Sequence, residues 1–199
     1  MRVLGIDACL GHCSVAVLEG DSVLAHRSES MARGHVERLA PMVADVLADA
    51  GIAPGMLDLI GVTCGPGGFT GARLGAAFAR GLALASGCRA VGVSTLEALA
   101  FPHRPEGVIV AIDGRRGDLF VQVFGDGDSD SRPEVIAVDE LPAFAARHET
   151  FRLVGPRDLP RIDPADIARI AATRADAQAP HPLYLRAPDA KVAMRPVLR

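Results

Sequence analysis

A glycine-rich turn in the first half of the sequence carries the strongest chemical signal. It contains Gly65, Pro66, Gly67, Phe69, Thr70 and Gly71, and it joins an expected strand at 59–63 to an expected helix at 70–86. Such a turn often forms a phosphate site, because the backbone N–H groups and the dipole at a helix N-terminus attract anions. The helix that follows is rich in small apolar residues, which suits close packing against another helix. The turn therefore predicts either a phosphate site or the start of a packing helix.

Neither of the common nucleotide motifs is complete in this turn. A P-loop needs a lysine after its last glycine, but Gly71 is followed by Ala72 and Arg73. A dinucleotide fingerprint beginning at Gly65 needs a third glycine where the chain has Thr70. We therefore predict a tight turn with Thr70 as the cap of the helix.

Two aspartates follow expected strands in corresponding parts of the two halves of the chain. Asp7 ends the strand 2–6, and Asp113 ends the strand 108–112. Carboxylates at equivalent strand ends of a duplicated sheet can face one another across a cleft that holds a metal-bound nucleotide. Aspartates are also common at strand ends because they accept turn N–H groups. Both interpretations stay open at this point.

The helix 70–86 has three different surfaces when its residues are placed 100° apart. Leu74, Phe78 and Leu82 form a bulky ridge beside a smooth strip of small residues, and two arginines lie opposite the ridge. We predict one contact with the parent sheet and a second with another helix, which is either the helix 36–50 or a helix of another subunit. In the intersubunit interpretation, the partner-binding residues are Val36, Leu39, Val43, Ala72, Arg73, Gly75, Ala76, Ala79, Arg80 and Ala83.

The elements that position these residues repeat once along the chain. The expected elements of the first half are strands at 2–6, 14–18 and 22–27, a helix at 36–50, a strand at 59–63, the helix 70–86 and a strand at 90–93, with Ser94 capping a short third helix. Those of the second half are strands at 108–112, 119–124 and 134–138, a helix at 140–148, a strand at 151–154 and a helix at 164–173 capped by Asp163. Both halves thus follow the order β-β-β-α-β-α.

The proline-rich segment 101–107 is the best boundary between two lobes. We predict an α/β protein with a first lobe at 1–103, a second and shortened lobe at 107–178, and a C-terminal segment at 179–199 that packs back on the body. Because the same order of elements occurs twice, we expect a duplicated structural unit and not an unrelated succession of strands and helices.

Composition limits the class of protein. The chain has 199 residues, 49% of them apolar, and a net charge of −3. It lacks a run of about 20 apolar residues, and an acid occurs as early as Asp7, so we expect a soluble cytoplasmic protein with no membrane partner. The four cysteines, Cys9, Cys13, Cys64 and Cys88, have irregular spacing, which predicts core thiols and no metal site.

Charge is distributed unevenly along the chain. Residues 1–150 hold 12 Lys and Arg against 19 Asp and Glu, whereas residues 151–199 hold 9 against 5. The basic end is either a solvated arginine-rich segment or a surface for a polyanion such as a nucleic acid. Aromatic residues do not alternate with its arginines, which favours the solvated interpretation.

The turn and the segments around it resemble a known family. The sequence Gly65-Pro66-Gly67-Gly68-Phe69-Thr70-Gly71-Ala72-Arg73-Leu74-Gly75 is similar to the signature of the bacterial TsaB family of tRNA threonylcarbamoyladenosine biosynthesis proteins. The similarity extends to Ile6-Asp7, Cys13 to Ala16, Gly92 to Ala100, Asp113 to Gly117 and Pro182 to Arg186. Gly68, Ala72 and Ala8 depart from the usual serine, leucine and threonine.

The resemblance implies a duplicated ribonuclease-H-like fold of the actin-like ATPase superfamily, in two lobes with the second truncated. It implies a scaffold subunit without catalytic residues of its own, which supports the catalytic paralogue TsaD together with the small ATPase TsaE. TsaD-like enzymes carry an H-x-x-x-H metal pair, and no two of the six histidines here are four residues apart. Asp7 and Asp113 would then be vestiges of a nucleotide site.

The resemblance further implies a homodimer when the chain is alone, tRNA contact only through the complex, and no cofactor apart from a nucleotide at a partner interface. A different class of function is an ATPase or phosphotransferase that uses Asp7 and Asp113 around magnesium. A metallopeptidase is a third class, for which the sequence offers no ligand pair.

Overall fold

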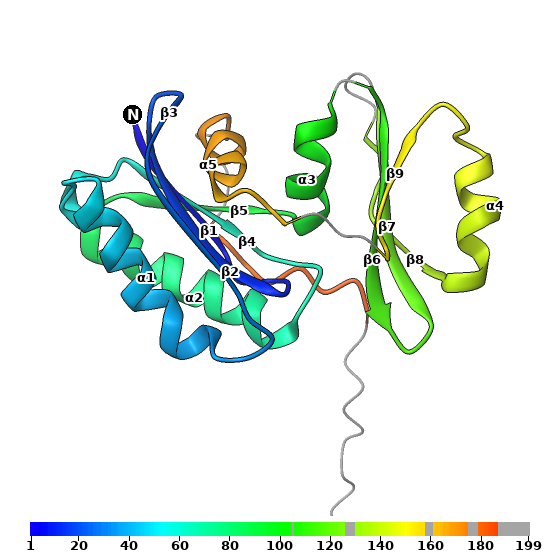
Figure 1. Cartoon of the computed structure of the whole chain (residues 1–199), viewed down its shortest axis with the longest axis horizontal. Helices are drawn as coiled ribbons and strands as arrows, with labels where there is room; N and C mark the ends of the chain where they lie inside the picture. Colours follow the sequence, from blue (N-terminus) through cyan, green and yellow to red (C-terminus); the bar gives the residue numbers. More distant parts are fainter. Residues whose placement is uncertain (105, 126–129, 158–160, 175–178, 187–199) are drawn as a thin grey trace, which may run out of the picture.

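The computed structural model describes residues 1–104, 106–125, 130–157, 161–174 and 179–186, which form two sheets with helices around them (Figure 1). The first sheet has the strand order β3-β2-β1-β4-β5. Its strands are β1 (Arg2–Asp7), β2 (His12–Glu19), β3 (Ser22–Ser30), β4 (Leu59–Thr63) and β5 (Arg89–Val93). β1 pairs antiparallel with β2 and parallel with β4, so the carboxyl ends of β1 and β4 lie at one edge of the sheet.

Helices cover both faces of the first sheet. Successive side chains of a strand point to opposite faces, so each strand contributes apolar residues to both sides. Leu4 and Ile6 of β1 face the helices α1 (His35–Asp49) and α2 (Phe69–Ser86), which lie side by side (Figure 1). Val3 faces the other side, where α5 (Pro164–Ala172) packs. The short helix η1 (Pro54–Met56) joins α1 to β4.

The second sheet has the order β8-β7-β6-β9. Its strands are β6 (Val108–Arg115), β7 (Asp118–Phe124), β8 (Glu134–Ala137) and β9 (Arg152–Val154). The helix α3 (Thr95–Ala100) packs on one face, and α4 (Leu141–Ala146) packs on the other. Two further single-turn helices, η2 (Phe101–His103) and η3 (Val138–Glu140), precede β6 and α4.

The two halves exchange their last helices. α3 ends the first half of the chain but packs on the second sheet, whereas α5 ends the second half but packs on the first sheet. The two helices therefore lie between the sheets and share one hydrophobic core (Figure 1). The predicted order β-β-β-α-β-α and the duplicated α/β fold with a shorter second copy are confirmed. The sequence does not predict this exchange.

Of the three predicted helix caps, the one at Thr70 is wrong, and Ser94 and Asp163 are the N-cap residues of their helices as predicted. α2 begins at Phe69 with Gly68 as the N-cap, so Thr70 lies inside the helix. Ser94 does precede α3, but its hydroxyl makes no capping bond. The predicted cap at Asp163 is confirmed, since its Oδ1 accepts a hydrogen bond from the backbone N–H of Ala165 at 2.9 Å. Within the described residues, no helix combines the length and apolar character that a membrane crossing requires.

Candidate functional site

A cleft of about 960 Å³ lies between the two lobes, at the carboxyl ends of β1 and β4. Six chain segments line it: the loop after β1, residues 31–35 at the start of α1, the glycine turn before α2, the hairpin between β6 and β7, residues 161–162 before α5, and the C-terminal residues 183–186. Asp7 and Asp113 are both among the lining residues, so the predicted placement of the two strand-end aspartates at one cleft agrees with the geometry. Their role as a nucleotide site stays a prediction.

The carboxyl group of Asp7 is committed to contacts within the chain. Asp7 is 1% exposed, and its Oδ1 accepts hydrogen bonds from the Thr63 hydroxyl at 2.6 Å and from the Cys9 N–H at 3.1 Å. Burial raises the pKa of Asp7, and these two hydrogen bonds only partly oppose the rise. A buried carboxyl group whose oxygen already accepts two hydrogen bonds from its own chain is poorly placed to bind a cation. The geometry thus favours a structural role for Asp7.

Asp113 has a different environment. It is exposed, and its Oδ1 accepts a hydrogen bond from the backbone N–H of Arg115 at 2.7 Å. This contact stabilises the end of β6, where the pairing with β7 shifts register between Asp113 and Arg115. The interpretation of Asp113 as an acceptor of turn N–H groups therefore has direct support.

The glycine turn packs against the loop after β1 so closely that side chains are excluded. A Cβ on Gly71 would lie 1.8 Å from the carbonyl oxygen of Ala8, and one on Gly67 would lie 2.5 Å from that of Cys9. The N–H of Gly68 donates to the same Cys9 carbonyl at 2.7 Å. Because backbone carbonyls occupy this side of the turn, these glycines serve close backbone packing.

The strip of small residues on α2 faces the sheet of its own chain. Its members, which are buried, are Ala72, Gly75, Ala76, Ala79 and Ala83. A Cβ on Gly75 would lie 3.1 Å from the Cγ2 of Val62, which shows how closely the helix approaches β4. The expectation that this strip contacts a partner is therefore corrected. Arg73 and Arg80, the other predicted contacts on α2, are exposed.

The predicted contacts on α1 divide in the same way. Leu39 and Val43 are buried in the core beneath the helix, which corrects their placement at a partner surface. Val36 is 58% exposed. The sequence pattern places these three residues on one apolar face of α1. That face is wider than the part that packs on the sheet, so Val36 at its edge remains outside the core.

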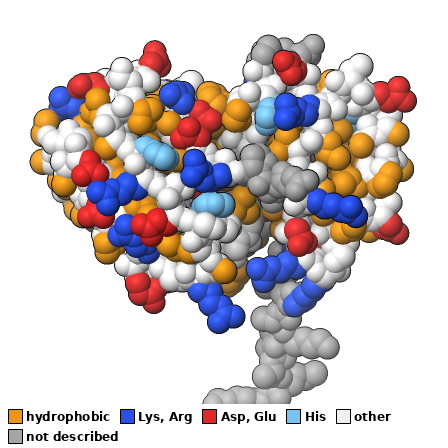
Figure 2. Space-filling model, in the orientation of Figure 1, with side chains coloured by type: hydrophobic (Ala, Val, Ile, Leu, Met, Phe, Trp, Pro, Cys, Tyr) orange, Lys and Arg blue, Asp and Glu red, His pale blue; other side chains and the backbone are white. Residues whose placement is uncertain are grey.

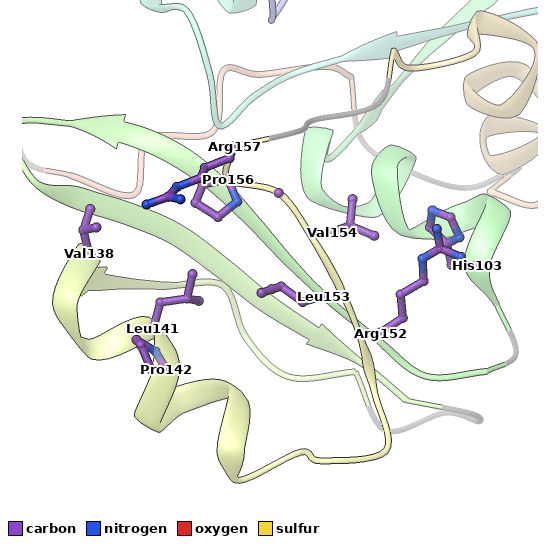
Figure 3. Close-up of a pocket in the computed structure, with 10 residues that line it drawn as sticks. His103, Val138, Leu141, Pro142, Arg152, Leu153, Val154, Pro156 and Arg157 are labelled. Atoms are coloured by element: carbon purple, nitrogen blue, oxygen red, sulfur yellow. The ribbon is translucent and has the colours of Figure 1, made fainter.

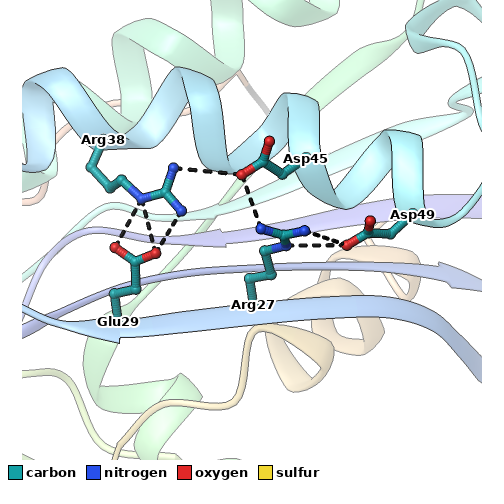
Figure 4. Close-up of polar contacts among 5 residues, drawn as sticks. All are labelled: Arg27, Glu29, Arg38, Asp45 and Asp49. Atoms are coloured by element: carbon teal, nitrogen blue, oxygen red, sulfur yellow. Dashed lines mark hydrogen bonds and ion pairs between the residues drawn. The ribbon is translucent and has the colours of Figure 1, made fainter.

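Ion pairs attach α1 to the edge strand β3 (Figure 4). Arg38 of α1 binds Glu29 of β3, with its Nε 2.8 Å from Oε2, and Arg27 of β3 binds Asp45 and Asp49 of α1 at 3.0 and 2.8 Å. The hydrogen bond from Arg38 lowers the pKa of Glu29. The network holds the side of α1 that faces β3, so the opposite flank of the helix turns toward α2.

An aromatic and basic cluster at the mouth of the cleft was missed by the sequence analysis. The guanidinium carbon of Arg73 lies 3.6 Å from the centre of the Phe69 ring, and its Nε donates to the Tyr184 hydroxyl at 2.5 Å. The N–H of Leu183 donates to the carbonyl of Cys64 at 2.8 Å, which fixes the C-terminal segment beside the turn. Residues 187–199 of the predicted C-terminal segment lie outside the described residues. The separation of 111 residues between Arg73 and Tyr184 explains why periodicity gave no signal.

The cysteines are free thiols, as the sequence analysis expected. Cys9, Cys13 and Cys64 are buried, and Cys88 is half-buried. Burial raises the pKa of Cys9 to about 12 and that of Cys64 to about 11, so both remain neutral near pH 7.

A second hollow of about 670 Å³ lies in the other lobe (Figure 3). It is formed by α4, β9 and the residues after β9, and its apolar lining includes Val138, Leu141 and Leu153. The basic groups beside it are Arg152, Arg157 and His103. It lacks the aspartates and the glycine turn, so the cleft between the lobes is the better candidate site.

Comparisons with known proteins agree with this geometry. The family model of TsaD, tRNA N6-adenosine threonylcarbamoyltransferase, matches residues 22–143. The tRNA threonylcarbamoyladenosine biosynthesis protein TsaB of Escherichia coli K12 is 40% identical over 124 residues, which cover 60% of this chain and 53% of that protein. The chain thus spans about half the length of this relative. The uncharacterized protein Rv3421c of Mycobacterium tuberculosis H37Rv is 36% identical over 199 residues, covering 95% of this chain and 93% of that protein.

A solved structure has the same architecture. YeaZ from Pseudomonas aeruginosa superposes with a TM-score of 0.75 at 27% sequence identity, covering 92% of this chain and 99% of that one. The agreement over nearly the whole of both chains confirms the two-lobed, ribonuclease-H-like fold.

Proposed function

Because this chain belongs to the family of the tRNA N6-adenosine threonylcarbamoyltransferase TsaD, whose model covers residues 22–143, we propose that it is a non-catalytic subunit of a tRNA threonylcarbamoyladenosine modification system. In this proposal the chain takes part in the biosynthesis of threonylcarbamoyladenosine in tRNA, the process for which its TsaB relatives are named. Its partner is a TsaD-like paralogue, with a TsaE-like ATPase as a further component. Alone it forms a homodimer.

The observation that carries the proposal is the outer surface of α1 and α2, called here the docking face. Its residues are exposed or half-buried and mostly small or apolar: Val36, Ala40, Pro41, Ala44, Ala48, Leu74, Ala77, Phe78, Gly81 and Leu84. The two helices contact each other on one face of the first sheet, so their outer sides form one surface (Figure 1). Leu84 alone is 86% exposed, which is unusual for so large an apolar side chain.

The docking face has the properties of a helix-packing surface. Exposed alanines at 40, 44 and 48 recur every four residues along one side of α1, where their small side chains allow another helix to approach closely. Ridges of side chains on another helix pack into the spaces between the side chains of such a surface. An apolar patch of this kind, bordered by Glu37, Arg73 and Arg80, is typical of a protein interface.

A catalytic role for the chain alone has less support. Asp7 is enclosed by Thr63 and Cys9, and the histidines are too far apart in sequence to form the pair of TsaD-like enzymes. The proposal therefore assigns the chemistry to the paralogue. This chain stabilises or orients that paralogue through the docking face.

Reconstituted tRNA modification tests this function. TsaD from the same organism, with tRNA and a supply of threonylcarbamoyl-adenylate, should modify tRNA only when this chain is added, and this chain without TsaD should give no product. Ala77→Glu should abolish the stimulation, whereas Val138→Glu, at a 48% exposed apolar position in the other lobe, should retain it. Full TsaD activity without this chain would refute the proposal.

A further inference from the structure

The mouth of the cleft combines exposed aromatic rings with a group of arginines. Phe69 is 59% exposed and Tyr184 is 50% exposed, and their ring centres lie 5.8 Å apart. Tyr184 is the one tyrosine of the sequence. Large rings that could be buried in a core instead lie open at the entrance of the cleft between the lobes. Arg73, which stacks over Phe69, holds the two rings in place.

Positive charge is concentrated around these rings. Arg73, Arg115, Arg161 and Arg186 line the cleft, and Arg116 follows at the tip of the β6–β7 hairpin. The acidic side chains facing this group are Asp113 and Asp118, while Asp7 is buried with a raised pKa. Arg186 is ion-paired with the half-buried Asp118. Arginines still outnumber the acidic side chains at the mouth of the cleft, on a chain whose overall net charge is −3. Figure 2 shows several basic side chains along the lower edge of the molecule, near where the two lobes meet.

Two arginines at the tip of the β6–β7 hairpin have an unusual backbone conformation. Arg115 and Arg116 have φ angles of 62° and 58°, in the left-handed region where glycine or asparagine is the ordinary choice. Positive φ at both Arg116 and Gly117 is what a two-residue hairpin turn of type I′ requires, so the turn fixes the backbone from which Arg116 projects. The tip lies at the same cleft as Phe69 and Tyr184.

We propose that the mouth of the cleft binds a single-stranded segment of RNA, with a base stacked on Phe69 and Tyr184 and the neighbouring phosphates on the arginines. Unpaired bases stack on exposed aromatic rings, and arginines neutralise the backbone beside them. A double helix hides the faces of its bases, so a duplex fits this cluster poorly. The choice of RNA as the nucleic acid rests on the proposed function. The binding itself involves this chain and not TsaD.

Fluorescence anisotropy of the full chain with a labelled single-stranded 12-nucleotide RNA tests the proposal. We expect saturable binding of the single-stranded RNA. The affinity for a duplex RNA of equal length should be at least about tenfold lower. Phe69→Ala should weaken binding about tenfold, because stacking on one aromatic side chain is worth that much, and Phe69→Tyr should restore it. Thermal melting of each variant identifies any loss of folding, and the Tyr variant keeps the test valid if the Ala variant unfolds.

The arginines have their own readout. The double variant Arg115→Ala, Arg116→Ala should reduce the slope of log K against log salt by about 1.4, or about 0.7 for each lost phosphate contact. Arg89→Ala is the matched control and should leave the slope unchanged. Arg89 is exposed and lies at the amino end of β5, away from the cleft at the carboxyl ends of β1 and β4. The absence of RNA binding, equal affinity for the duplex, or an equal effect of Arg89→Ala would overturn the proposal. None of these results depends on TsaD, so they are distinguishable from failure of the modification assay.

Discussion

The backbone of Gly71 packs directly on the carbonyl group of Ala8, at a distance that leaves no space for a Cβ. Gly71 belongs to the first turn of α2, and Ala8 follows the carboxyl end of β1. This contact packs the glycine turn against the loop after β1, so backbone atoms of the chain fill the space beside the turn. It explains why the turn carries glycines although neither phosphate motif is complete.

Gly71→Ala should therefore destabilise the protein by about 3 kcal/mol or more, because the new Cβ would lie 1.8 Å from the oxygen of Ala8. Gly81→Ala in the same helix is the matched control, since a Cβ there meets no atom within 4 Å. Alanine favours a helix over glycine, so this control should gain up to about 1 kcal/mol. Chemical denaturation measures both free energies of unfolding, and equal effects of the two changes would contradict the packing argument.

Ala79 and Ala77 separate folding from docking within one turn of α2. Ala79 is fully buried against the sheet, so Ala79→Glu places a charge in the core and should cost at least about 3 kcal/mol. Ala77 is exposed on the docking face, so Ala77→Glu should leave the free energy of unfolding nearly unchanged. Thermal melting and circular dichroism check this difference. A folded and stable Ala79→Glu variant would show that the strip of small residues does not face the sheet.

Asp7 should make the stability of the protein depend on pH. Burial raises its pKa in the folded state, so the folded chain holds a proton that the unfolded chain releases above pH of about 3.9. This contribution to stability is complete below the unfolded pKa and is lost as the pH rises through the folded pKa. Asp7→Asn keeps an oxygen for Thr63 and Cys9 but removes the titration.

The stability of Asp7→Asn relative to the natural chain should consequently rise between pH 4 and pH 7. Unfolding by urea at several pH values gives this difference directly and cancels the contribution of Asp166, whose pKa burial also raises. If Asp7→Asn instead loses stability as the pH rises, an ionised Asp7 must be favourable, as the magnesium hypothesis requires.

The ion pairs between α1 and β3 should stabilise the position of the helix weakly and in a salt-dependent way. Arg38→Met keeps most of the aliphatic side chain but removes the bond to Glu29 (Figure 4). Both side chains are partly exposed, so the fall in Tm should be small at low salt and should shrink further in 1 M NaCl. Arg89→Met, at an exposed position away from this network, is the control. A fall in Tm that does not change with salt would assign the effect to packing.

The sequence predicts the order of elements well because each has a strong local signal. The apolar run of β1 and the recurrence of apolar residues in α1 depend only on near neighbours. The exchange of α3 and α5 between the sheets carries no such signal, because a helix with one apolar face fits either sheet. Local pattern also could not distinguish Gly68 from Thr70 as the start of α2, since the contact that decides it is with Cys9, far away in sequence.

The candidate site is predictable only in part for the same reason. Strand ends placed Asp7 and Asp113 at one cleft, because duplicated sheets bring equivalent ends together. The orientation of α2 was less accessible, since a helical wheel gives two apolar sides but not which of them meets the sheet. Small residues allow the closest backbone approach, and here that approach is to β4. The contact of Arg73 with Tyr184 depends on the path of the C-terminal segment, which periodicity does not describe.

The most direct test of the proposed partnership is size-exclusion chromatography with light scattering on this chain mixed with TsaD of the same organism. We predict one peak with the mass of a complex, and separate peaks for the two proteins when Ala77→Glu or Leu84→Glu replaces the natural chain. Val138→Glu should still form the complex. Separate elution of the natural chain and TsaD, or a complex that both docking-face variants leave intact, would contradict the account.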